Sequence, residues 1–132
     1  MKKTILYIRS DKHEEFLLGL SHHGDISIQT YHCPIGTMSQ QFIPKLELFF
    51  KNNRCKLEDI DAIVVYRGPG SYTSLRIGIS CANTLAFAQN IPIVGISKQK
   101  DFTPASITKI IFTNSFIKPV NPYYHPTPNL PL

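Results

Sequence analysis

The chain has 132 residues and a mass of 14.9 kDa, which suits one domain and leaves no room for two cores of ordinary size. Hydrophobic residues make up 42% and charged residues 17%, a globular composition that excludes disorder of the whole chain. The net charge is +5, and the excess lies in residues 62–132, which hold six basic residues and only one acid. This asymmetry suggests a negatively charged partner, either an acidic protein face or nucleic acid.

The cysteines and the start of the chain bear on its location. Cys33, Cys55 and Cys81 show no CxxC spacing, which argues against a disulfide framework and a thiolate zinc site. The apolar stretch at 4–8 is shorter than a signal-peptide core of roughly 7 to 15 residues. No window approaches the roughly 18 apolar residues of a membrane span. We therefore expect a soluble cytoplasmic protein with no membrane partner.

The first part of the chain predicts three strands. Residues 4–9 are β-branched and aromatic, a second apolar run covers 15–20, and 26–31 alternates with period two. Gly24-Asp25 lies between the last two runs and reads as a hairpin turn. These strands are expected to form an antiparallel meander.

A helix follows the meander. Phe42, Leu46, Phe49 and Phe50 fall at i, i+4, i+7 and i+8, which is the apolar stripe of an amphipathic helix that runs to about Asn53. Since proline is tolerated near the first turn of a helix, Pro44 predicts a start near residue 41.

The next segment predicts a strand, a turn, a helix and a strand. Residues 60–66 form a short apolar run typical of a central parallel strand. After the turn at 68–70, Ser71 or Thr73 can cap a helix that keeps apolar spacing to about residue 89. Residues 91–97 are one more short strand.

The order β-β-β-α-β-α-β predicts an α/β fold with a mixed sheet, in which right-handed crossovers make the later strands parallel neighbours. Residues 107–112 could add a strand, but five of the ten prolines lie between 119 and 131, so this tail cannot continue a sheet or helix. We expect a lobe over residues 1–97 and a remnant with a Pro-rich tail over 98–132.

The segment around Gly68-Pro69-Gly70-Ser71 is the most distinctive. A glycine-rich turn that leads into a helix can bind an anion with free N–H groups. However, no lysine lies between Lys56 and Lys98, as a Walker A loop requires, and Thr73 stands where a dinucleotide fingerprint needs glycine. A tight strand-to-helix turn without a ligand is the simpler interpretation.

Small residues recur every fourth position in the following helix, at Ser74, Gly78, Ala82 and Ala86. Such a stripe permits close approach of another backbone, either this chain's own sheet or a partner helix. Spacing alone favours packing in the chain's own core and leaves the partner helix open.

The sequence shows no convincing catalytic or metal-binding set. No HxxxH or HExxH spacing occurs, and Cys33 beside His32 is more simply an unreactive thiol than a nucleophile. The acids lie near strand entrances, where solvated charge is the rule. We expect no cofactor.

Together, GPGSYTSLRIG, the preceding strand DAIVVYR and the following ANTLAFAQNIPIVGIS resemble the signature of the TsaB (YeaZ) family. That family usually has GPGS, an aromatic residue and TGLRIG, then a helix with small residues and a strand like IPVVGVS. The resemblance covers roughly residues 38–97, and implies a single actin-like, ribonuclease-H-type lobe.

The resemblance also implies partners. A TsaB-like protein is the non-catalytic partner of a TsaD-type catalytic subunit in threonylcarbamoyladenosine modification of tRNA; a TsaE-type ATPase joins this pair, homodimers form through related surfaces, and contact with tRNA is indirect. The implied partner-binding residues lie in the GPGS turn and the following helix. They are Gly68, Pro69, Gly70, Ser71, Tyr72, Thr73, Ser74, Leu75, Arg76, Gly78, Ala82 and Ala86.

The sequence departs from the family pattern at three places. Arg9 stands where an acid is usual, which argues against an actin-like nucleotide or metal site, and Ser74 replaces a glycine. The family normally has a second lobe of about the same size, whereas 35 Pro-rich residues follow Ser97 here, so we expect a minimal or degenerate TsaB-like protein. Alternative functions are a nucleotide-binding phosphotransferase that uses Gly68–Ser71, a degenerate homodimeric binding module, and auxiliary tRNA binding by the basic second half.

Overall fold

The structure is a computed structural model that describes residues 4–22 and 24–97. It contains one sheet, two α-helices and a short 3-10 helix. The elements in chain order are β1 Ile5–Arg9, β2 Glu15–His22, β3 Asp25–His32, α1 Met38–Asn52, η1 Leu57–Asp59, β4 Ala62–Gly68, α2 Tyr72–Gln89 and β5 Ile93–Ser97. The predicted order of strands and helices is confirmed. The proposed strand at 107–112 and the segment 98–132 lie outside the described residues.

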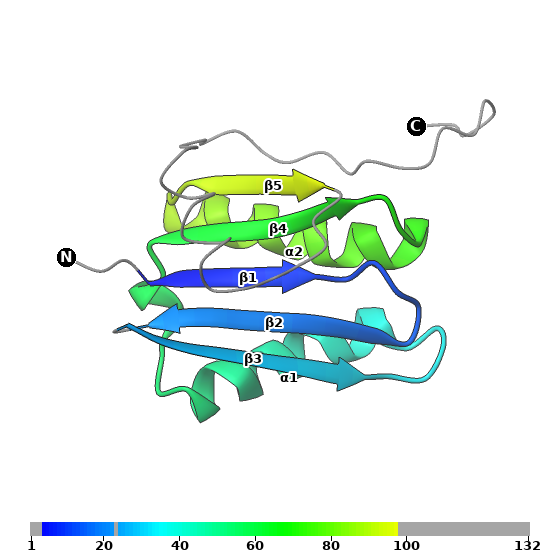
Figure 1. Cartoon of the computed structure of the whole chain (residues 1–132), viewed down its shortest axis with the longest axis horizontal. Coiled ribbons are helices and arrows are strands. Elements are labelled where there is room, and N and C mark those ends of the chain that lie inside the picture. The colour runs from blue at the N-terminus through cyan, green and yellow to red at the C-terminus, as the bar shows by residue number, and fades with distance from the viewer. Residues whose placement is uncertain (1–3, 23, 98–132) are drawn as a thin grey trace.

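The sheet is mixed, with the strand order β3-β2-β1-β4-β5 (Figure 1). β1 pairs with β2 and β2 with β3 in antiparallel fashion, which confirms the predicted meander. β4 is parallel to both β1 and β5. The carboxyl ends of β1, β4 and β5 therefore meet at one end of the sheet.

The central strands β1 and β4 are buried on both faces. Leu6 and Ile8 of β1 and Val64 of β4 have no exposed surface. In parallel register, Ile8 lies beside Val65 and Leu6 beside Ile63, so large β-branched and aliphatic side chains form layers across the sheet. This burial explains why both segments are near-continuous apolar runs instead of alternating ones.

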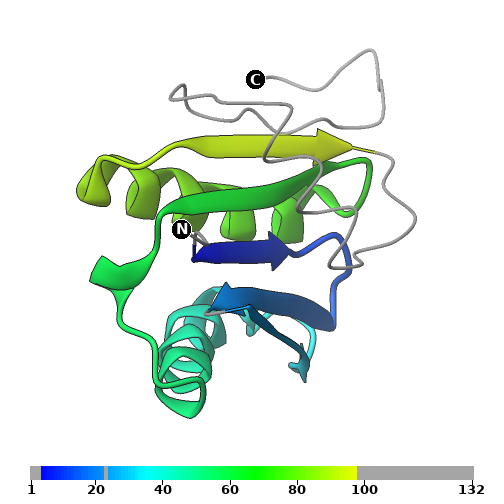
Figure 2. The ribbon, with the colours of Figure 1, turned by 60° about the vertical axis from the view of Figure 1, so that its left-hand side comes forward.

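Both helices lie on the same face of the sheet (Figures 1 and 2), with α1 behind β2 and β3 and α2 behind β1 and β4. α1 buries Met38, Phe42, Leu46 and Phe49, and the ring centroids of Phe42 and Phe16 are 4.7 Å apart. The expected apolar stripe is thus the face that covers the sheet.

The start of α1 differs from the prediction. The helix begins at Met38 instead of near residue 41, so Pro44 lies inside it and not in its first turn. Pro44 and Gln40, whose carbonyl would have accepted the missing N–H, are both exposed to water. Because solvent can satisfy that carbonyl and Met38 gains a buried place in the core, the helix tolerates the proline.

α2 begins after Ser71, one of the two predicted caps, and ends at Asn90 with a left-handed φ of 54°. Its buried residues follow the predicted apolar spacing: Ser74, Leu75, Gly78, Ile79, Ala82 and Ala86. Within residues 4–22 and 24–97, no helix is both long enough and apolar enough to cross a bilayer.

Candidate functional site

The GPGS turn joins the end of β4 to the start of α2. Gly68 has a φ of 116°, a backbone conformation that favours glycine, and the Gly68–Pro69 peptide bond is cis. Gly70 is required for space, because a Cβ there would lie 2.6 Å from Cβ of Asp11 and 2.9 Å from its carbonyl oxygen. The absence of a side chain at Gly70 therefore allows the turn to pack directly against the loop that follows β1.

Hydrogen bonds hold these two loops together. The backbone N–H of Ser71 donates to the carbonyl of Asp11 over 2.9 Å, and the Ser71 hydroxyl lies 3.1 Å from Nδ1 of His13. Within the turn, the Tyr66 hydroxyl donates to the carbonyl of Pro69 over 3.0 Å. The GPGS turn is therefore held by the loop that follows β1, through Asp11 and His13, and by Tyr66 of β4.

Arg9 is engaged by its own chain. Its Nε and Nη2 donate to the two carboxylate oxygens of Asp11 over 3.0 and 3.1 Å, and its guanidinium lies 4.3 Å from the ring centroid of Tyr66. Burial lowers the pKa of Arg9, but the hydrogen bond and negative charge of Asp11 raise it more, so the net shift is upward. Burial raises the pKa of Tyr66. Arg9 is therefore held within its own chain by Asp11 and Tyr66.

The small-residue stripe of α2 packs on the sheet of the same chain. A Cβ at Gly78 would overlap the Ser10 hydroxyl and lie 3.1 Å from Cγ2 of Ile8. The Ser10 hydroxyl also donates to the carbonyl of Ser74 over 2.7 Å. Ala82 has no exposed surface and Ala86 only 5%. The structure thus shows the own-core packing that spacing favoured.

Only part of the predicted partner-binding set is accessible to a partner in this structure. Six of its twelve residues are buried by the chain itself: Gly68, Ser74, Leu75, Gly78, Ala82 and Ala86. The remaining six reach the surface. Thr73 and Arg76 are exposed, while Pro69, Gly70, Ser71 and Tyr72 are half-buried.

Tyr72 and Arg76 form a pair on the outer side of α2. Nη1 of Arg76 donates to the Tyr72 hydroxyl over 2.9 Å, and the guanidinium lies 5.4 Å from the centre of the tyrosine ring. One turn of helix separates them, which brings their side chains together. This pair gives the accessible part of the segment a cationic and aromatic character.

Phe87 of α2 is an exposed aromatic residue that the sequence did not single out as a candidate surface residue. Phe87 is 90% exposed, the largest exposure among the large hydrophobic side chains described here. The signal was available, since Phe87 is an aromatic residue that does not fall on the apolar stripe of its helix. It lies at the far end of α2 from the GPGS turn.

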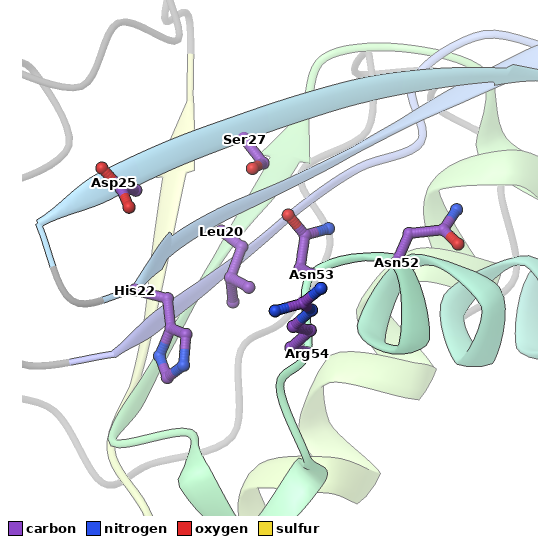
Figure 3. Close-up of a pocket in the computed structure, with 7 residues that line it drawn as sticks. All are labelled: Leu20, His22, Asp25, Ser27, Asn52, Asn53 and Arg54. Atoms are coloured by element: carbon purple, nitrogen blue, oxygen red, sulfur yellow. The ribbon is translucent and has the colours of Figure 1, made fainter.

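A separate cavity of about 510 Å³ lies at the other end of β1, between the β2–β3 hairpin and the end of α1 (Figure 3). Its lining is largely polar: Leu20, His22, Asp25, Ser27, Asn52, Asn53 and Arg54. A hydrogen bond of 2.9 Å joins Nδ1 of His22 to the Thr4 hydroxyl. Across the part of the chain that the structure describes, no three His, Cys, Asp or Glu side chains gather as a metal site would need.

The structure describes only residues 62–97 of the basic second half of the chain. Of its six basic residues, Arg67 and Arg76 lie within the described residues, whereas Lys98, Lys100, Lys109 and Lys118 lie outside them. The expectation of auxiliary tRNA binding therefore stays a prediction.

Comparison with known proteins gives matches of two kinds, to TsaB proteins and to tRNA N6-adenosine threonylcarbamoyltransferases. A family model described as TsaD, tRNA N6-adenosine threonylcarbamoyltransferase, matches residues 37–109, more than half of the chain. The chain is 32% identical over 80 residues to the tRNA threonylcarbamoyladenosine biosynthesis protein TsaB of Escherichia coli K12. This match covers 61% of the chain and 34% of the E. coli protein, so the chain spans about a third of that relative's length.

Two solved structures bear on the fold. YeaZ from Pseudomonas aeruginosa is similar with a TM-score of 0.67 and 28% identity, over 73% of this chain and 44% of that one. T. thermophilus RuvC, in complex with a Holliday junction substrate, has a TM-score of 0.50 at 9% identity, over 74% of this chain and 66% of that one, and shows the fold alone. The predicted single actin-like, ribonuclease-H-type lobe is confirmed.

Proposed function

Because this chain belongs to the TsaB (YeaZ) family, we propose that it acts in threonylcarbamoyladenosine biosynthesis on tRNA, as a non-catalytic partner of a TsaD-type enzyme. The observation that carries the proposal is the family signature GPGSYTSLRIG, built as a rigid turn and helix start with an accessible outer side. The lobe over 1–97 is the pairing unit in this proposal.

The pairing surface consists of the accessible members of the predicted set: Pro69, Gly70, Ser71, Tyr72, Thr73 and Arg76. Several features suit it to a protein partner. The turn is fixed by the hydrogen bonds to Asp11 and His13, so little conformational freedom is lost on binding. Tyr72 and Arg76 are of the residue types that most often dominate binding energy at interfaces.

The hydrogen bonds of the polar side chains near the GPGS turn support a non-catalytic role. Ser71 and His13 form a hydroxyl–imidazole pair, but none of the carboxylates in the described segments hydrogen-bonds to His13 to orient it. Arg9 is bound by Asp11 and stacked on Tyr66. A Ser–His–acid arrangement needs all three members in contact.

The finer partners belong to the same proposal. A TsaE-type ATPase would join through the TsaD-type subunit, and tRNA would be contacted indirectly through the complex. A cytoplasmic location is consistent with Cys33, Cys55 and Cys81 being free thiols.

Capture of a TsaD-type protein from the same organism, co-expressed with the full chain, tests the proposal. We expect a stable complex whose mass equals the sum of the two chains. Arg76→Glu should weaken capture about tenfold or more, since reversing a charge at an interface places it against groups selected for a cation. Arg54→Glu is the matched control, because it reverses an exposed arginine at the opposite end of β1.

Two results would contradict the proposal. A chain that stays alone when the TsaD-type protein is abundant would remove the partner role. If the Arg54→Glu variant, the Arg76→Glu variant and the unmodified chain are all captured equally, the partner role stands. The assignment of the pairing surface to the GPGS turn and the start of α2 is then wrong. Hydrolytic or transfer activity of the isolated chain that Ser71→Ala abolishes would overturn the non-catalytic role.

A further inference from the structure

One face of the sheet carries neither of the two α-helices, because α1 and α2 both lie on the opposite face (Figures 1 and 2). Ile8 of β1 points toward Gly78 of α2, so the residues that alternate with Ile8 point away from the helices. The register carries this face across the parallel strands, since Tyr7 lies beside Val64 and Val64 beside Val94. We call the side chains on this side of β1, β4 and β5 the helix-free face: Ile5, Tyr7, Val64, Tyr66, Val94 and Ile96.

The helix-free face is buried, although no helix or strand of the described residues lies over it. All six of its side chains are at most 8% exposed. β5 is an edge strand, so Val94 and Ile96 would be open to water if nothing lay on them. On the same face of the other edge strand, Ile28 is 44% exposed. A cover therefore lies over β1, β4 and β5 and does not extend to β3.

The two tyrosines of this face show that the cover is a layer above the sheet. A Cβ on Gly19 would lie 3.2 Å from Cδ2 of Tyr7, so one side of the Tyr7 ring lies on the backbone of β2. The whole residue is nevertheless only 3% exposed, and burial raises the pKa of its hydroxyl well above the usual range. Arg9 lies over the ring of Tyr66 and accounts for part of the burial there. The sheet itself does not supply the rest.

The length of the chain beyond β5 identifies what can form this layer. The exposed fractions are those of a single chain, so the cover belongs to the same chain as the sheet. Residues 1–3 and 23 are too few to cover three strands. The other residues outside the described ranges are 98–132, a segment of 35 residues that continues from Ser97, the last residue of β5. β5 is the edge strand of the covered half of the sheet.

The segment has the reach and the composition for this role. Thirty-five extended residues span about 110 Å, whereas three strands are crossed in about 15 Å. Residues 119–131 contain five prolines, but residues 102–117 contain only Pro104. This second part also holds seven large apolar side chains: Phe102, Ile107, Ile110, Ile111, Phe112, Phe116 and Ile117.

We propose that residues 102–117 dock on the helix-free face with their apolar side chains and complete the core of the lobe. A sheet with two apolar faces is stable in water only when both faces are covered. The docked segment also withdraws this face from any partner. The proposal does not rest on the partner role, because the GPGS turn joins β4 to α2 and its accessible residues are not part of the helix-free face.

Hydroxyl-radical labelling of the full chain, read by mass spectrometry, tests the docking without any substitution. We expect Tyr7 and Tyr66 to react about fivefold or more slowly than Phe87, which is exposed, because labelling requires access to solvent. Their protection should be the same at low and high protein concentration. Fast labelling of both tyrosines would mean that the face is uncovered, and protection that appears only at high concentration would assign the cover to a second copy. Either result would overturn the proposal.

A matched pair of double variants identifies the segment that docks. Ile110→Ser with Ile111→Ser should raise the labelling of Tyr7 about threefold or more, because the apolar contacts that hold the segment are lost. Labelling of Phe42, on the helix side of the sheet, should not change. Leu130→Ser with Leu132→Ser makes the same kind of change outside residues 102–117 and should leave both rates unchanged.

Phe42 also separates undocking from unfolding. If the Ile110→Ser, Ile111→Ser variant raises the labelling of Phe42 as well, the chain has unfolded, and the single change Phe116→Ser replaces it in the same comparison. The proposal is wrong if changes within 102–117 leave Tyr7 protected in a folded chain, or if the leucine pair exposes Tyr7 as much as the isoleucine pair does.

Discussion

The two helices cover the same face of one sheet but hold to it in opposite ways. α1 reaches the sheet with large side chains, so Phe42, Leu46 and Phe49 fill the space between its backbone and β2. α2 brings its backbone close, and Gly78, Ala82 and Ala86 leave room for β1 and β4. The stability of α1 on the sheet therefore depends on keeping side-chain volume, whereas that of α2 depends on adding none.

Phe42→Ala should be the most damaging change. Phe42 is 1% exposed and packs on the ring of Phe16, so its truncation removes apolar contacts and leaves a cavity. We expect the free energy of unfolding to fall by about 3–5 kcal/mol, measured by urea denaturation. Ile43→Ala, at the adjacent and largely exposed position, should change it by no more than about 0.5 kcal/mol. Equal effects at the two positions would contradict the assigned orientation of α1.

Ala82→Leu should lower stability by about 1–3 kcal/mol, because Ala82 is fully buried and a larger side chain cannot fit there without strain. Ser80→Leu adds an exposed leucine to the same helix and is the control. The measurements are melting temperature and solution mass on each sample. Loss of association with an unchanged melting temperature would mean that the stripe faces a partner instead of the sheet.

Gly78→Ala and Ser10→Ala should show coupled effects. Ser10→Ala alone removes the hydrogen bond to the Ser74 carbonyl and should cost about 1 kcal/mol. Gly78→Ala should cost less in the Ser10→Ala background, since the hydroxyl that its Cβ would overlap is gone. A double-mutant cycle should give a coupling energy of about 1 kcal/mol. Additive effects would show that Ser10 does not limit the approach of α2.

The thiols associated with the two helices predict a small alkaline effect. Burial raises the pKa of Cys81 in α2 from 9.0 to about 11, and burial together with the charge of Asp59 raises that of Cys55, beyond α1, to about 11. A raised pKa means that the folded state holds its proton longer than the unfolded state. Stability should therefore be unaffected by these thiols up to pH 8 and decrease between about pH 9 and 11.

The corresponding measurement is urea denaturation across that pH range. At pH 10 the loss should be about 1 kcal/mol or less for each thiol. Cys81→Ala should reduce the dependence of stability on pH, because the variant lacks this thiol. It should not abolish the dependence, because the other alkaline groups titrate in both proteins. An identical pH profile in the two proteins would contradict the assigned environment of Cys81.

The local pattern of the sequence was enough to predict every strand and both α-helices of the described lobe, but not the 3-10 helix Leu57–Asp59. Short apolar runs and period-3.6 spacing are properties of neighbouring residues, so 4–9, 60–66 and the stripe of α2 could be assigned without any long-range contact. The start of α1 was wrong for the same reason. The rule for Pro44 is local, but the burial of Met38 and the exposure of Gln40, which make the proline tolerable, depend on how the helix lies on the sheet.

The sequence by itself also determined the family, because GPGSYTSLRIG is a contiguous signature. Only the tertiary structure decided which residues of that segment are accessible. Spacing shows that Ser74, Gly78, Ala82 and Ala86 share one face of a helix, but not what that face meets. The loop after β1, far away in the sequence, supplies the Asp11 backbone against which Gly70 packs and the Ser10 hydroxyl that lies against Gly78. Contacts between distant segments decide burial, and these contacts have no local period from which they could be predicted.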